Sequence, residues 1–130
     1  MKTKIIMTSS AIMLGSVSII FSFLPDEVIG YLQFERTQNL VLVFQIIGAL
    51  YFALAMLNVM SRNSVIGGIY NKPTSISNFA HFSIGSITLI KALFVNIHLP
   101  YIYWVVAFVY TVFAFAFGSI AFFHPAPKSA

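Results

Sequence analysis

Cysteine is absent from this sequence of 130 residues, and charged residues are scarce. Without a thiol, the chain has no disulfide framework, no thiolate metal site and no cysteine nucleophile. Charged residues make up 8% of the chain, whereas about 25% is usual in soluble domains. So few charges do not cover a water-facing surface, and we expect most of the chain to be surrounded by lipid.

Acidic residues are rarer than basic ones. There are three, Asp26, Glu27 and Glu35, and all of them lie outside the long apolar runs. A carboxylate proton relay of the kind common in membrane pumps therefore has no residue within those runs. Hard cations also lack their usual ligands there. No nucleotide-binding loop, pair of catalytic carboxylates or serine–histidine–acid set can be assembled. We therefore expect no catalytic residue, no enzyme activity and no cofactor.

Apolar residues, in contrast, make up 59% of the chain and gather in four runs. Each run is about 20 residues long, which at about 1.5 Å per residue spans the hydrocarbon core of a bilayer. In lipid every backbone polar group must bond within its own segment, so each run should be a helix. The expected helices cover residues 5–24, 40–60, 76–97 and 101–123.

These four helices predict an all-α, polytopic membrane protein with a single domain over residues 1–130. Because the connections are short, the simplest arrangement is an antiparallel up-down-up-down four-helix transmembrane bundle. The prolines Pro25, Pro73 and Pro100 fall in the connections, where they interrupt helices. The first run is expected to be a retained helix rather than a cleaved signal peptide, since no small-x-small cleavage pattern follows it.

Basic residues mark one side of the predicted bundle: Lys2, Lys4, Arg62, Lys72 and Lys128 all fall there if the helices cross in turn. The connection 25–39, with all the acids, falls on the opposite side. Lysine and arginine accumulate in cytoplasmic loops, so we expect an inner-membrane protein with both termini in the cytoplasm. The net charge of +4 thus reflects membrane edges, and we expect no nucleic-acid partner.

Small and polar residues recur every three or four positions in each run, as Gly15, Gly48, Gly85 and Gly118 illustrate. Membrane helices pack where small residues let backbones approach and where polar side chains bond across. We expect these stripes to face other helices while Phe, Leu, Ile and Val face lipid. Some stripes could instead face a second copy of the chain or another membrane protein, and both alternatives stay open.

Five polar side chains are candidates for lining the centre of the bundle: His81, Thr88, Asn58, Gln45 and Asn96. The simpler interpretation is hydrogen bonding between helices, with His81 bonded to Asn58 or to a backbone carbonyl. The alternative is a proton or substrate pathway. His124 lies on the same side as His81, but a metal or haem site there would lack a third ligand, so we expect no metal.

Lys91 is the one charge placed within a predicted helix, about five residues from its outer end. A lysine stem covers most of that distance, so its ammonium can snorkel to the interface. The alternative is an outer-side charge cluster in which Lys91 pairs with Asp26, Glu27 or Glu35. That cluster would close a vestibule or bind an anionic head group.

The segments PDEVIGYL and GALYFALAM resemble a pattern in bacterial four-helix integral membrane families of unknown function. In those families a proline and an acid follow the first helix, and a glycine–tyrosine motif lies in the second. The matching residues are Pro25, Glu27, Gly48 and Tyr51. The resemblance implies a four-helix fold and no particular activity.

The segment FERTQN also resembles the glutathione-dependent four-helix membrane enzymes, through Glu35, Arg36 and Asn39. The spacing is shorter than in that family, and Leu40 stands where the family has an acid. Those enzymes also keep this region in the cytoplasm, whereas the charge distribution places it outside. These departures disfavour the enzyme that the resemblance implies.

The composition therefore predicts a small integral membrane protein that acts through helix packing, as a subunit, an accessory or a lipid-associated component. Abundant small-residue packing surface beside few reactive groups is the basis of this expectation. The alternative is a carrier or channel for a small or hydrophobic compound through the bundle.

Overall fold

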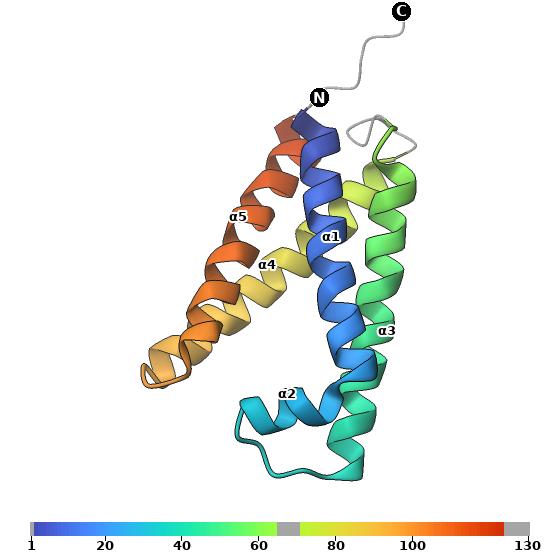
Figure 1. The fold of residues 1–130 in the computed structure, drawn as a ribbon. Coiled ribbons are helices and arrows are strands. Elements are labelled where there is room, and N and C mark those ends of the chain that lie inside the picture. Colours follow the sequence, from blue (N-terminus) through green and yellow to red (C-terminus); the bar gives the residue numbers. More distant parts are fainter. Residues whose placement is uncertain (1, 65–70, 124–130) are drawn as a thin grey trace, which may run out of the picture. The chain divides into compact units, whose positions relative to one another are not determined.

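The computed structural model describes residues 2–64 and 71–123, and in these two stretches all regular structure is helical. Five α-helices follow one another: α1 (Lys2–Phe23), α2 (Pro25–Tyr31), α3 (Gln38–Ser61), α4 (Lys72–Val95) and α5 (Tyr101–Phe123) (Figure 1). All but α2 are long and apolar enough to cross a membrane. The all-α class and the four apolar spans are therefore confirmed.

The third expected helix, 76–97, differs from the structure at both of its ends. Helix α4 begins at Lys72 rather than residue 76, because Pro73 lies in its first turn instead of interrupting it. Proline is tolerated there, since the first backbone N–H groups of a helix have no partner within it. At the other end α4 stops at Val95, so Asn96 lies beyond the helix that was expected to carry it.

The connection 25–39 also contains the short helix α2, which the sequence analysis did not predict. Pro25 begins α2 instead of only ending α1, and the acids Asp26 and Glu27 follow in its first turn. Proline fits the first helical position, and carboxylates there favour the positive end of the helix dipole. After α2 the chain turns at Gln33, which adopts a left-handed φ of 58°.

The chain forms two compact units, of which one is Met7–Met60. Within it, α1 and α3 lie side by side (Figure 1). Ser10 bonds to Asn58 near one end, and Ser22 meets Gly48 farther along. Residue numbers therefore rise along α1 while they fall along α3, so the two helices form an antiparallel hairpin.

The second unit comprises Met1–Ile6 and Ser61–Ala130 and contains the α4–α5 pair. Ser86 bonds to Thr111, and farther from the connecting turn Phe79 packs edge-on against Phe122. These helices are also antiparallel. Each unit thus supplies one helical hairpin, and the joining of both into one bundle and one domain stays a prediction.

Gly48 allows α1 and α3 to approach at the level of their backbones. A Cβ atom added to Gly48 would lie 3.0 Å from the backbone nitrogen of Ser22 and 3.1 Å from the carbonyl oxygen of Ser18. Real Cβ atoms need more room than this, so a side chain here would push the helices apart. This contact is the kind of small-residue packing that the sequence predicted.

The glycines of α4 and α5 instead receive aromatic rings. A Cβ on Gly85 would lie 2.5 Å from ring carbons of Tyr110, and one on Gly118 would lie 3.1 Å from the ring of Phe79. Phe82 and Phe117 are fully buried and stacked, with ring centroids 5.7 Å apart. The expectation that phenylalanine faces lipid is therefore wrong for Phe82 and Phe117, which stack on each other inside the hairpin.

Candidate functional site

The polar contact of His81 lies inside the α4–α5 hairpin. The Nε2 atom of His81 and the hydroxyl of Tyr110 are 3.3 Å apart, and the tautomer of the ring decides which one donates. Gly85 lies one turn after His81 on α4, and because it has no side chain it leaves room for the ring of Tyr110. Phe82 packs edge-on against both His81 and Tyr110. The partner expected for His81 was Asn58 or a carbonyl, and the structure adds Tyr110.

Tyr110 is not among the polar side chains that were predicted from the sequence. Its position offered a signal, since it lies nine residues after the start of α5 at Tyr101 and is buried. A buried phenol normally finds a hydrogen-bond partner. A tyrosine so deep in a span therefore indicates a polar side chain on the neighbouring helix.

A second polar contact joins the two helices of this hairpin. The hydroxyl of Thr111 donates to the carbonyl oxygen of Ala107 at 2.7 Å and lies 2.6 Å from the hydroxyl of Ser86. Because the Thr111 proton is used on the carbonyl, Ser86 is the donor in the contact between the hydroxyls. Both side chains therefore act as a bond between helices.

Asn58 plays the matching part in the α1–α3 hairpin. It is fully buried, and its amide nitrogen donates to the hydroxyl of Ser10 at 2.9 Å. That hydroxyl donates in turn to the carbonyl oxygen of Met7 at 3.0 Å. The chain of donors crosses from α3 to α1 and fixes the register of the hairpin.

The other three lining candidates lie elsewhere. Gln45 is exposed on α3, and Thr88 is exposed on α4, where its hydroxyl donates to the carbonyl oxygen of Ile84 at 2.8 Å. Asn96 follows α4, and its side-chain oxygen accepts from the backbone N–H of His98 at 3.1 Å. A shared lining made by all five residues stays a prediction, since they are divided between the two units.

An ion pair joins the two ends of the connection that contains α2. Nε of Arg36 lies 2.6 Å from Oδ1 of Asp26, with both side chains more than half exposed. The hydrogen bond and charge of Asp26 raise the pKa of the Arg36 guanidinium, so it stays protonated at any ordinary pH. Exposed ion pairs contribute little to stability. We therefore interpret this pair as a contact that keeps the two ends of the connection close together.

The remaining members of the expected outer-side cluster are exposed. Glu27 lies on α2 and Glu35 in the irregular segment between α2 and α3, while Lys91 lies on α4 in the other unit. The structure pairs Asp26 with Arg36, a partner that the sequence analysis did not name. An approach of Lys91 to these acids stays a prediction.

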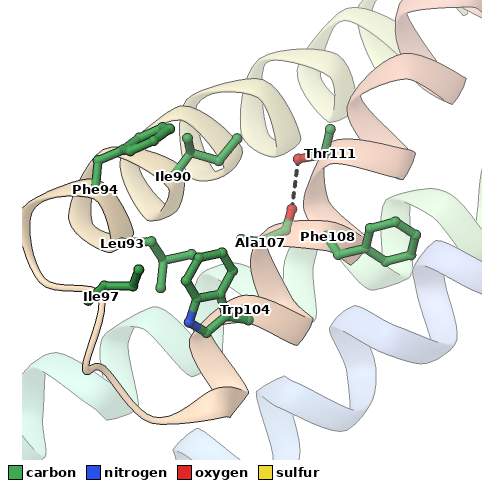
Figure 2. A pocket seen from close by; sticks show the side chains of 8 residues that line it. All are labelled: Ile90, Leu93, Phe94, Ile97, Trp104, Ala107, Phe108 and Thr111. Atoms are coloured by element: carbon green, nitrogen blue, oxygen red, sulfur yellow. Dashed lines mark hydrogen bonds between the residues drawn. The ribbon is translucent and has the colours of Figure 1, made fainter.

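An apolar groove of about 370 Å³ opens between α4 and α5 near their connecting turn (Figure 2). Leu93 and Ala107 are buried and form its floor, whereas Phe94, Trp104 and Phe108 are exposed along its rims. Ile97 lies at the turn end, and Thr111 lies deepest along α5. The complete lining is Ile90, Leu93, Phe94, Ile97, Trp104, Ala107, Phe108 and Thr111.

Comparison with protein-family models, with curated proteins and with solved structures gave no match. Both family resemblances therefore stay predictions. Among residues 2–64 and 71–123, no three potential ligands (His, Cys, Asp or Glu) gather as a metal site would require. His124, the possible companion of His81, lies outside the described residues. The groove and the polar contacts within the two hairpins are thus the candidate functional features of the described residues.

Proposed function

We propose that this chain is a small integral membrane protein that works through the packing of its two hairpins, as a subunit or accessory of a membrane assembly. The supporting observation is that its internal polar groups are engaged. In the described part of the chain, every buried side-chain nitrogen or oxygen atom has a hydrogen-bond partner. Polar groups that are bonded to each other hold helices together. A carrier, in contrast, needs polar groups that are free to bind the transported compound.

The exposed surface of the α4–α5 hairpin supports the same proposal. Phe94 is 87% exposed, and Phe115 and Phe108 are more than 70% exposed. Such side chains are stable only against lipid or another apolar protein surface. We further propose that the protein lies in the inner membrane with both termini in the cytoplasm, on the basis of its lysine and arginine distribution.

The absence of native cysteine permits a direct test by crosslinking. Single cysteines at the exposed positions Ile12, Ile46, Ile84 and Phe115 would be oxidised in native membranes. A packing protein should form disulfide-linked dimers, or a thiol-reactive crosslinker should capture a partner, at one or two positions only. A chain that stays monomeric and uncaptured at all four positions contradicts the proposal.

Replacing His81 with leucine distinguishes the packing proposal from the carrier alternative. In a packing protein, His81→Leu should lower thermal stability or assembly, because Tyr110 loses its 3.3 Å partner. A carrier should instead stay folded and assembled while losing transport. Thr88→Val is the matched control, because Thr88 is exposed and bonds to its own helix.

A further inference from the structure

The groove between α4 and α5 lies beside a cation for which its own unit offers no acidic side chain. Lys91 follows the groove residue Ile90 and lies one turn before Phe94, an exposed residue of the groove rim. Residues three apart are neighbours on a helix surface, so Lys91 is next to Phe94. The sequence contains no aspartate or glutamate beyond Glu35, and none within the first six residues. The hairpin therefore combines an apolar groove with an exposed positive charge.

The levels of these features along the helix suit an amphipathic molecule. Helix α4 ends at Val95, so Lys91 lies four residues, or about 6 Å, below the helix end, within reach of its own stem. Along α5 the groove extends from Trp104 to Thr111, a length of about 10 Å. Thr111 contacts Ser86, so the inner end of the groove lies more than one helical turn deeper than Lys91. The ammonium group of Lys91 at the interface suits a phosphate head group, and the apolar groove suits an acyl chain.

The groove walls also exclude a polar occupant. Seven of the eight lining residues have no hydroxyl, carbonyl or charge in their side chains, and the eighth, Thr111, uses its hydroxyl on Ala107 and Ser86. Only the indole N–H of Trp104 adds a donor, in the first turn of α5. Tryptophan at that level is typical of a lipid head-group boundary.

We propose that this groove is a binding site for an anionic phospholipid, with one acyl chain between α4 and α5 and the phosphate beside Lys91. The inference rests on the proposed function only in requiring that α4 and α5 span a bilayer. It adds a ligand class and a charge-bearing residue that determines head-group preference.

Trp104 provides the reporter, because it is the only tryptophan in the chain and it lines the groove. The full-length protein is placed in phosphatidylcholine vesicles that contain equal amounts of brominated phosphatidylglycerol or brominated phosphatidylcholine. Bromine quenches tryptophan only at close range, so the quenching measures which lipid occupies the groove. We expect about a fivefold preference for the anionic lipid, the effect of one lysine near a membrane surface.

The head-group assignment is tested with Lys91→Gln, which should abolish the preference. Lys72→Gln removes a cation at the other end of α4 and should leave the preference unchanged. Lys91→Arg keeps the charge and should keep the preference, so loss of the preference in both Lys91 variants would assign the lysine a role in folding and overturn the proposal. Equal quenching by both lipids in the wild type would overturn it too.

The acyl-chain assignment is tested with Ala107→Leu, which adds bulk to the floor of the groove and should lower quenching by both lipids. Val105→Leu is the control, since Val105 is exposed and lies outside the lining. Wild-type protein that neither lipid quenches would show that protein covers the groove, which contradicts the proposal. Flotation of the vesicles separates the two failures, because a chain that does not float with lipid refutes the membrane-spanning proposal itself.

Discussion

At the scale of single residues, glycines in this protein have different roles that depend on what lies opposite them. Gly48 faces the backbone of α1, and Gly85 faces the ring of Tyr110. Gly15, in contrast, has only the Cβ of Ala55 nearby, at an ordinary 3.9 Å. The same residue type in the same kind of helix is therefore required at some positions and replaceable at others.

This contrast predicts opposite effects of one substitution at two positions of the α1–α3 hairpin. Gly48→Ala should destabilise the protein by about 1–3 kcal/mol, because a methyl group there forces two backbones apart. Gly15→Ala should be neutral or slightly stabilising, since alanine has the better helix propensity. Thermal unfolding of both variants in one detergent, followed by circular dichroism, measures the difference. Equal effects would show that α1 and α3 do not pack closely at Gly48.

At the scale of elements, α2 is held by apolar packing rather than by its visible charges. Ile29 is 1% exposed and lies in a cluster with Val41 and Phe44 of α3. The Asp26–Arg36 pair, in contrast, is exposed to solvent. Burial of an isoleucine stabilises far more than an exposed ion pair.

We therefore predict that Ile29→Ala releases α2, while Asp26→Asn does not. Loss of the buried side chain costs about 2 kcal/mol, which corresponds to about 30-fold faster hydrogen exchange of the α2 amides if they exchange by local opening. Gly30→Ala is the matched control, because nothing lies within 4 Å of the added methyl group. Faster exchange in Asp26→Asn with no change in Ile29→Ala would show that the ion pair holds α2.

At the scale of the whole molecule, the distribution of basic residues predicts the topology. Single cysteines would be placed at Thr3, Thr37, Asn63 and His98, in a chain that has none of its own. A membrane-impermeant maleimide added to intact cells should label positions 37 and 98, which lie in the outward connections. Positions 3 and 63 should react only after the membrane is opened. The reverse pattern would invert the topology, and labelling of 37 and 63 from the same side would exclude four crossings in turn.

Much of this fold follows from composition. The four spans could be predicted because lipid forces every apolar run of sufficient length into a helix, and the run 101–123 matches α5 at both ends. Helix α2 escaped prediction because seven residues carry little periodic signal. The start of α4 was predicted too late, because proline interrupts a helix interior but is accepted in a first turn, where Pro73 lies.

The candidate site was less accessible to the same reasoning. His81 and Asn58 could be singled out, since polar groups in apolar runs need partners. Their partners, Tyr110 and Ser10, depend on the rotation and register of neighbouring helices. The groove is harder still to predict, because residues of both α4 and α5 line it and no single run contains it.

The sequence by itself determined that the chain is helical and apolar, with four helices long enough to cross a membrane, because a bilayer leaves few structures for a chain with so little charge. Only the tertiary structure decided that Gly85 receives the ring of Tyr110 and that phenylalanines fill the α4–α5 hairpin. It also placed Trp104 beside an open groove. The physical reason is that composition determines the solvent of a helix, whereas contacts depend on how the surfaces of two helices fit together.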